Sequence, residues 1–360
     1  MTSKNLTVHT LNLNAQIMKV NGDIRVIGKL NNGHDFGNID LNFGMLNING
    51  NLRQIGGTMN INNGTLNVNG WYKLQDEEKN TIEEIIEREV SAKINMTNVR
   101  DKINVDGDFI VHTGEENVVN NGVINIGGNF IQKNSEYGDG RGYFKLKGNN
   151  KVILKGKRDI VVGGEDRYFQ FGQLEIENGN TRKIIFKDHV NVEKLLSPVT
   201  VISDELKINK FDVNRQNMMV MGDIAELGDV NLTAGEMTVN GDIFQDSDVD
   251  LNFGTLNVNG NLRQTGGTMD INNGTLNIKG WYKLQNEEKN TIGEIVEVPV
   301  DAKIKMTNAR DKVNVDGDFV IHSKNGSTLT DGAITIKGNF KQKNGGNNGN
   351  FNCNGNHWSM

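Results

Sequence analysis

The chain has 360 residues, a net charge of -6 and a hydrophobic fraction of 36%. Its basic residues are scattered, so there is no basic field for a polyanion and nucleic-acid binding is not expected. The 43 glycines follow no three-residue period, which excludes a collagen-like chain. No apolar run approaches the length of a membrane span, so we expect none. Residues 1–8 lack the apolar core of a signal peptide.

One short motif recurs along the whole chain. In Leu46–Leu52 an alternation of apolar and asparagine residues is followed by Asn49-Gly50 and a return to an apolar residue. The alternation predicts a strand with Leu46, Ile48 and Leu52 inside and Asn47 outside. Asn49-Gly50 predicts a turn, because both residue types tolerate positive φ. Further copies lie at 18–24, 66–70, 103–109, 124–130, 237–243, 256–262, 276–280, 313–319 and 334–340.

The spacing of the motif predicts how the strands are arranged. Gly50 and Gly70 are 20 residues apart, and Gly241 and Gly260 are 19 apart. This spacing fits one rung of a solenoid. We therefore predict an all-β fold, a single-stranded parallel β-helix (β-solenoid) with rungs of about 20 residues, in which the turn asparagines of stacked rungs hydrogen-bond one another. A β-sandwich or an antiparallel meander is the alternative, because Asn-Gly also favours hairpins.

A second period of about 210 residues marks a tandem duplication. Asp40–Thr81 reappears as Asp250–Thr291. We expect a first solenoid unit at 1–200, with an irregular segment at 131–187, and a second unit at 201–360 that stops in mid-repeat, the two forming one continuous solenoid.

Each unit also contains a charged excursion, at 76–91 and at 286–301. The first could be a short helix with Asn80 or Thr81 as its N-cap. The second contains Gly293 and Pro299 within an alternating pattern, which opposes a helix. We therefore expect an extended surface arm in both.

The segments Met96–Phe109 and Val123–Gln132 carry a family resemblance. They resemble the Gly/Asn-rich parallel β-solenoid repeats of very large surface or secreted proteins of low-GC, clostridia-like bacteria. The resemblance implies a repeat scaffold exposed outside the cell and brings no catalytic residues. It implies a cell-surface or secreted location as part of a larger protein, whereas a cytoplasmic location would follow if this chain were the whole gene product.

Two identical aromatic pairs are the candidate binding residues: Trp71 with Tyr72, and Trp281 with Tyr282. Tyr72 occupies the inward position of Leu52, which predicts a core residue. Trp71 occupies the outward position of Asn51, which is unusual for so large an apolar side chain. Trp71 is expected to be covered by the charged excursion, with a binding platform for a sugar ring or a protein partner as the alternative.

No cofactor and no metal are expected. Asp246, Asp248 and Asp250 are spaced by two, but Leu251 stands where a calcium loop needs glycine. A polysaccharide-cleaving β-helix would need paired carboxylates, and turn chemistry alone explains the candidates, so we expect no enzyme. Those candidates are Asp106, Asp108, Asp316 and Asp318, with His112 and His322 nearby.

These observations favour a structural role: a display scaffold or adhesin-like stalk of a bacterial surface protein, without catalysis. One alternative is a self-polymerising cytosolic β-helix scaffold, and another is a polysaccharide-binding or polysaccharide-cleaving β-helix. The expected partners are other protein chains or surface glycans, with end-to-end self-association for a scaffold with open rungs.

Overall fold

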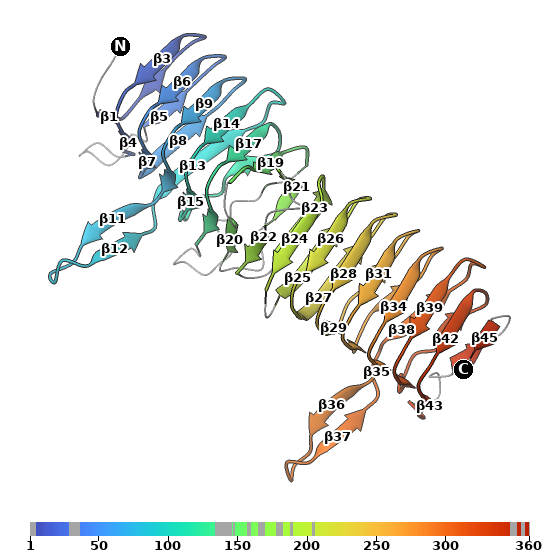
Figure 1. Ribbon diagram of the computed structural model, residues 1–360. Helices are drawn as coiled ribbons and strands as arrows, with labels where there is room; N and C mark the ends of the chain where they lie inside the picture. The colour runs from blue at the N-terminus through green and yellow to red at the C-terminus, as the bar shows by residue number, and fades with distance from the viewer. Residues whose placement is uncertain are drawn as a thin grey trace. The chain divides into compact units, whose positions relative to one another are not determined.

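The computed structural model describes residues 5–28, 37–133, 146, 148–156, 160–164, 170–177, 183–187, 190–203, 206–345, 351–353 and 357–359. All regular elements in these ranges are short β-strands, most of them in parallel stacks, and the fold is a parallel β-solenoid (Figure 1). None of the described residues belongs to a helix that could cross a membrane. The chain divides into two compact units, Met1–Leu196 and Ser197–Met360.

Each coil of the first unit crosses three parallel sheets. We call them the motif face, which holds the recurring motif, the return face, which follows the Asn-Gly turn, and the third face. The motif face contains β3 (Ile17–Val20), β6 (Met45–Ile48), β9 (Thr65–Val68), β14 (Lys102–Val105), β17 (Val123–Ile126), β19 (Lys151–Leu154), β21 (Phe171–Ile176) and β23 (Val190–Leu195). The return face contains β1 (Leu6–Val8), β4 (Ile24–Val26), β7 (Leu52–Gln54), β10 (Tyr72–Leu74), β15 (Phe109–Val111), β18 (Phe130–Gln132), β20 (Ile160–Gly164) and β22 (Lys183–Phe186). The third face contains β2 (Leu11–Asn12), β5 (Asn38–Asp40), β8 (Gly56–Asn60), β13 (Ser91–Met96) and β16 (Val118–Val119).

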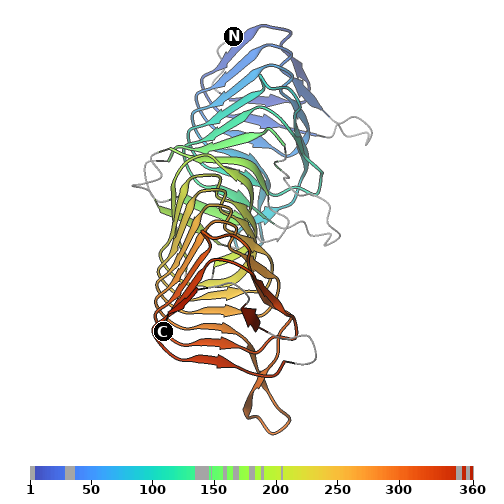
Figure 2. The same cartoon turned by 90° about the vertical axis from the view of Figure 1, so that its right-hand side faces the viewer.

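The second unit has the same three faces, and its coils are seen from another direction in Figure 2. Its motif face contains β24 (Val199–Ile202), β26 (Asn217–Val220), β28 (Glu236–Val239), β31 (Thr255–Val258), β34 (Thr275–Ile278), β39 (Lys312–Val315), β42 (Ala333–Ile336) and β45 (His357–Ser359). The long strands β25 (Leu206–Asp212) and β27 (Ile224–Asn231) extend over the return and third faces. The return face continues with β29 (Ile243–Gln245), β32 (Leu262–Gln264), β35 (Tyr282–Leu284), β40 (Phe319–Ile321) and β43 (Phe340–Gln342). The third face continues with β30 (Val249–Asp250), β33 (Thr268–Asp270), β38 (Lys303–Met306), β41 (Ser327–Leu329) and β44 (Phe351–Cys353).

The core is a set of ladders in which like residues stack on like. Leu46 pairs with Leu66 in register, and both side chains are fully buried. Ile48 and Leu52 are also buried, which confirms the predicted inward positions. The return face adds an aromatic column: the Tyr72 and Phe109 rings stack with centroids 5.1 Å apart, and Phe109 stacks on Phe130 at 5.4 Å. Apolar burial along these columns stabilises each coil only through its neighbours.

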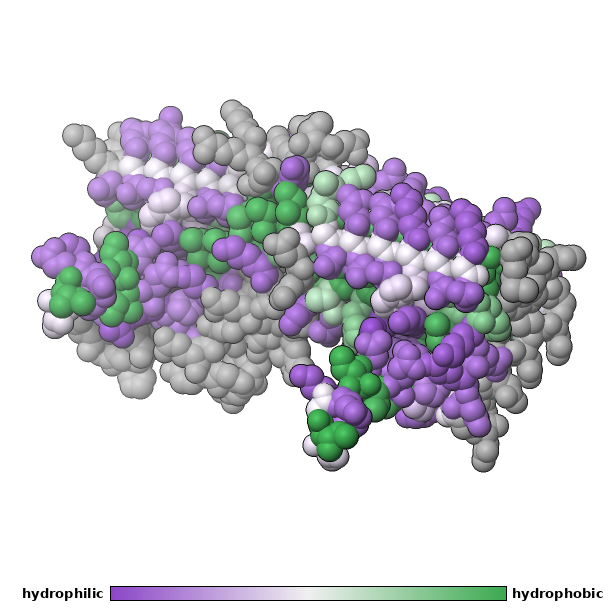
Figure 3. All heavy atoms as spheres, turned by 60° about the horizontal axis from the view of Figure 1, so that its bottom comes forward, coloured by the Kyte–Doolittle hydropathy of each residue, from purple (hydrophilic) through white to green (hydrophobic). Residues whose placement is uncertain are grey.

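Asparagine ladders run along the outside of the motif face. In the first unit the Asn67 amide nitrogen donates to the Asn47 oxygen at 2.7 Å, and Asn104 donates to Asn67 at 2.6 Å. In the second unit Asn277 donates to Asn257 at 2.8 Å. Figure 3 shows hydrophilic side chains in rows along the stack. The predicted bonding concerned the turn asparagines, and it is confirmed: Asn49 donates to Asn21 at 3.2 Å, and Asn259 donates to Asn240 at 2.8 Å. The strand ladders of the motif face are additional to that prediction.

The explanation predicted for Asn49-Gly50 is wrong, because neither residue has a positive φ. The left-handed residues lie at another corner, where Asn62 and Asn63 have φ of 44° and 60°. Gly50 is required for a different reason: a Cβ there would lie 2.8 Å from the backbone of Gly22. The motif glycines stack backbone on backbone, and the Gly50 N–H donates to the Gly22 carbonyl.

Each charged excursion is an antiparallel hairpin that leaves the coil after the return face (Figure 1). The first arm consists of β11 (Asp76–Lys79) and β12 (Ile85–Arg88), and the second of β36 (Asn286–Lys289) and β37 (Ile295–Val298). Of the irregular segment at 131–187, the described parts add strands to the motif and return faces, and residues 134–145, 147, 157–159, 165–169 and 178–182 lie outside the described residues.

Candidate functional site

Tyr72 and Tyr282 are core residues and not part of a binding surface. Both side chains are completely buried. The Tyr72 hydroxyl donates to the Gln54 side-chain oxygen at 2.5 Å, and Tyr282 donates to Gln264 at 2.7 Å. Burial raises the pKa of both phenols, so they stay protonated and continue to donate. The predicted inward position is confirmed for both.

Trp71 lies outside the coil and is half-buried. Two cations cover its ring: the Arg53 guanidinium carbon is 5.3 Å from the ring centroid, and the Lys73 ammonium is 4.9 Å from it. In the second unit Arg263 and Lys283 lie over Trp281 at 5.6 and 4.5 Å. Such cation–π contacts stabilise an exposed pair by about 0.5–1 kcal/mol. Two cations therefore already lie over each indole, which makes it a poor stacking platform for a sugar ring.

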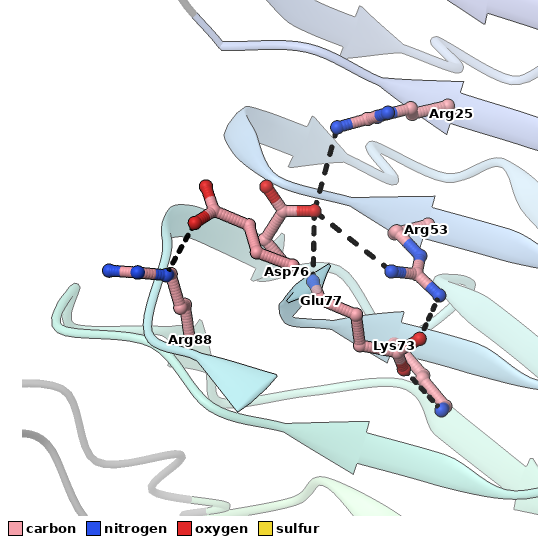
Figure 4. A network of polar contacts seen from close by, with 7 residues as sticks. Arg25, Arg53, Lys73, Asp76, Glu77 and Arg88 are labelled. Carbon is pink, nitrogen blue, oxygen red and sulfur yellow. Dashed lines mark hydrogen bonds and ion pairs between the residues drawn. The ribbon is translucent and has the colours of Figure 1, made fainter. Parts of the chain in front are cut away.

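The cations over Trp71 also hold the first arm, as Figure 4 shows. The Glu77 carboxylate of β11 accepts hydrogen bonds from Arg53 and Lys73, both at 2.8 Å. Arg25 and Arg53 lie 3.5 and 3.9 Å from the Asp76 carboxylate. The expected cover over Trp71 is thus indirect, because the base of the arm fixes the cations that lie on the ring.

A further ion pair fixes the second strand of each arm. Lys133, which follows β18, pairs with Glu87 of β12, and Lys343 pairs with Glu297 of β37. In the second unit Glu287 pairs with Arg263 at 3.1 Å and lies 3.9 Å from Lys283. Sequence reasoning missed these anchors. The signal was present, since Arg53, Lys73, Glu77, Glu87 and Lys133 recur in the second copy as Arg263, Lys283, Glu287, Glu297 and Lys343. Arg25 and Asp76 do not recur, because Phe244 and Asn286 stand in their places.

The Glu77 carboxyl responds to opposing influences. Its desolvation by burial raises the pKa, but hydrogen bonds from Lys73 and Arg53, with their positive charges, outweigh the desolvation and lower the pKa below 4.5. A depressed folded-state pKa means that the anchor contributes stability above the ordinary glutamate pKa. That contribution is lost as the pH falls through the folded-state pKa.

We therefore expect acid to release the arm. In a chain whose other tryptophans are replaced (Trp281→Phe, Trp358→Phe), Trp71 fluorescence should change as the pH falls below 4.5, because protonated Glu77 no longer fixes the cations over the indole. Glu77→Gln is the matched control: it should give the acid-like spectrum already at neutral pH. An unaltered acid transition in Glu77→Gln would assign the change to another group.

The end of each arm exposes large apolar side chains. Ile82, Ile85 and Ile86 are 71%, 65% and 41% exposed, and in the second arm Ile292, Ile295 and Val296 are 77%, 68% and 37% exposed. We call each of these sets an arm tip. Figure 3 shows hydrophobic side chains on both arms. Ile85 and Ile86 are consecutive on β12, so they lie on opposite faces of the hairpin, and Ile82 lies in its turn. Large apolar side chains exposed on both faces of a projecting hairpin indicate an interaction site.

The turn at each arm tip is well defined. The Asn80 side-chain oxygen accepts from the Ile82 and Glu84 N–H groups at 3.0 and 2.8 Å, and Asn290 does the same in the second arm. Glu83 has a φ of 63° and its counterpart Gly293 a φ of 83°. Gly293, which opposed a helix in the sequence, is thus the left-handed residue of a hairpin turn.

Both arms are strongly acidic. Residues 76–91 contain seven acidic and two basic side chains, a net charge of -5, and residues 286–301 contain five and one, a net charge of -4. Within each arm the isoleucines therefore lie among glutamates. Such a surface attracts cations and repels a second acidic surface, so it selects the charge of a partner.

Of the four carboxylates considered for catalysis, two accept hydrogen bonds from the backbone of the next coil. Asp108 accepts from the Asn129 backbone N–H at 2.7 Å, and Asp318 accepts from Asn339 at 2.8 Å. The Asn339 backbone hydrogen bond, with that of its side chain, lowers the pKa of Asp318, which opposes use of that group as a general acid. Asp316 pairs with Lys337 at 2.8 Å, and His112 is buried. Asp108 and Asp318 thus perform the turn chemistry that their sequence context predicts.

Asp248 and Asp250 also bond within the fold, to the Thr268 N–H at 2.7 Å and to the Asn272 amide at 3.4 Å. Within the described ranges no three His, Cys, Asp or Glu side chains are grouped so that they could hold a metal ion. Comparison with protein-family models, with curated proteins and with solved structures gives no match.

Proposed function

We propose that the chain is a structural scaffold that displays two docking arms, each binding a positively charged, apolar segment of another protein. The observation that carries this proposal is the repetition of the same exposed arm tip, on the same charged anchor, in both units. A surface or secreted location, as part of a larger protein, rests on the family resemblance.

The chemistry of the arms defines the partner. Each arm is a two-stranded sheet with its own exposed backbone edges. An extended segment can add a strand to such an edge, with main-chain hydrogen bonds supplying affinity and side chains supplying selectivity. Its apolar side chains would cover the isoleucines, and its lysines or arginines would meet the glutamates. A second acidic arm would be repelled, which disfavours pairing of arms between copies of this chain.

Three short peptides test this partner against the full chain by fluorescence anisotropy. An alternating valine–lysine peptide should bind. A serine–lysine peptide of equal charge should bind at least about tenfold more weakly, because it cannot cover the isoleucines, and a valine–glutamate peptide should not bind.

The matched variants change only the arm tips. Ile82→Ser, Ile85→Ser and Ile86→Ser, with the equivalent changes at Ile292, Ile295 and Val296, should weaken valine–lysine binding to the level of serine–lysine. The exposed residues Phe43 and Phe253 lie elsewhere, and replacing them by serine should leave binding unchanged. Equal binding of both lysine peptides, unaffected by the arm variants, would contradict the proposal and indicate general attraction to an acidic chain.

A further inference from the structure

The first unit has a polar groove on its motif face, separate from the arm. Its volume is about 400 Å³, within the usual range of ligand sites. Its floor is the amide ladder of Asn47, Asn67, Asn104 and Asn125. Its wall is the row that follows the strand ends: Asn69, Asp106 and Gly127, each two residues after a floor asparagine, and Lys155 on the next coil.

The amides of the floor are held in place but not saturated. Asn67, Asn104 and Asn125 each donate one N–H to the preceding amide oxygen, at 2.7, 2.6 and 2.8 Å. A side-chain amide has two N–H donors and two lone pairs on oxygen. Asn67 and Asn104 are half-buried, so each keeps one donor and one acceptor for a ligand, one strand spacing of about 4.8 Å apart, whereas Asn125 is buried.

The wall contains two charged groups without partners in the described structure. The Asp106 carboxylate and the Lys155 ammonium are both exposed, and neither forms an ion pair or side-chain hydrogen bond with the described residues. Gly127 lies between them, so they are two strand spacings, about 10 Å, apart along the row. Because Gly127 has no side chain, the row is notched at this coil.

The second unit has longer, charged side chains at two of these positions. The residues that correspond to Asn69 and Gly127 are Lys279 and Lys337, and the Lys337 ammonium pairs with Asp316 at 2.8 Å. The carboxylate that has no partner among the described residues of the first unit is thus paired in the second. The two units therefore differ in size and charge at the lining positions of the groove.

From this arrangement we propose that the groove binds an uncharged oligosaccharide chain. Hydroxyl and acetamido groups both donate and accept hydrogen bonds, as the amides of the floor require. Asp106 accepts from hydroxyls and Lys155 donates to oxygens, and their charges cancel, so the groove does not select an ionic ligand. An extended peptide fits less well, because its residues repeat at about 3.3 Å and the floor repeats at about 4.8 Å.

The lining residues include no aromatic side chain. Recognition therefore depends on hydrogen bonds that compete with water, and the affinity for a single site is expected in the millimolar range. This site is independent of the docking arms: arm-tip variants should leave it unchanged, so failure of one proposal leaves the other standing.

Saturation-transfer NMR on the full chain provides the test, with cellohexaose and chitohexaose as probes and a glycine–serine peptide as the control. At least one hexasaccharide should bind saturably. Asp106→Asn should weaken that binding about tenfold, because a charged acceptor is lost. Asn69→Lys, which introduces the residue of the second unit and so suits the fold, should abolish it by filling the groove.

Asp316→Asn in the second unit is the matched control and should leave binding unchanged. Thermal melting of each variant shows whether it remains folded, and Lys155→Gln provides a second surface substitution that does not touch the core. The proposal is overturned if neither hexasaccharide binds, if binding persists in both Asp106→Asn and Asn69→Lys, or if the glycine–serine peptide binds equally well.

Discussion

Replacing Tyr72 by alanine is expected to lower the free energy of unfolding of the first unit by about 3–5 kcal/mol. The ring is fully buried, pairs in register with Leu52 on one side and Phe109 on the other, and stacks on Phe109. Its removal leaves a cavity in the aromatic column. It also deprives the Gln54 oxygen of its donor, and Gln54 joins the return face to the third face through the carbonyls of Gly57 and Lys93.

Urea unfolding measures the loss in free energy of unfolding. Hydrogen exchange, read out on peptides from each unit during the urea titration, shows which unit is destabilised. Tyr72→Phe separates the two contributions: it keeps the ring, leaves a buried acceptor unpaired, and should cost about 1–3 kcal/mol. Tyr282→Ala is the matched control, with the loss in peptides of the second unit. A midpoint for Tyr72→Ala equal to that of Lys79→Ala, which changes an exposed arm residue, would contradict the core position of the ring.

Replacing Gly107 by alanine should cost about 1–3 kcal/mol, at the upper end of that range. A Cβ at Gly107 would lie 2.8 Å from the Gly70 carbonyl oxygen, 2.9 Å from its carbon and 3.0 Å from the Trp71 nitrogen. All three are backbone atoms, which cannot rotate away as a side chain can. The Gly107 N–H donates to Gly70 and its carbonyl accepts from Gly128, so the strain is transmitted to both neighbouring coils.

The measurement is again the urea midpoint. Lys102→Ala, an exposed change on the preceding strand, is the control and should have little effect. If the glycine served only to permit a positive φ, alanine would be strained by its backbone conformation alone and the coil spacing would not matter. A Gly107→Ala chain as stable as the control would show that the stacked glycines are not closely packed.

The strand pattern of the fold could be predicted because it is local. Leu46, Ile48 and Leu52 alternate with polar residues, and a period of two assigns each side chain to one face whatever the rest of the chain does. The spacing of most motif glycines, 19 to 21 residues, then indicates which coils stack. For the same reason Tyr72, in the position of Leu52, could be assigned to the core.

The reasons for particular residues could not be predicted where they depend on a neighbouring coil. Gly50 was attributed to positive φ, but the atom that requires glycine belongs to Gly22, one coil away. The cover of Trp71 comes partly from Arg53, 18 residues earlier, which only the stacking of β7 on β10 brings beside the indole. The contrast between Gly127 and Lys337 is visible in the sequence, but its effect on Asp106 depends on which coils are adjacent.

The stoichiometry of peptide binding tests the docking role of the arms most directly. Titration calorimetry of the full chain with the valine–lysine peptide should give two sites per chain, because the two arm tips and their anchors are alike. Serine substitutions in the first arm tip should leave one site, and substitutions in both should leave none. Two sites that persist when both arm tips are substituted would contradict the account.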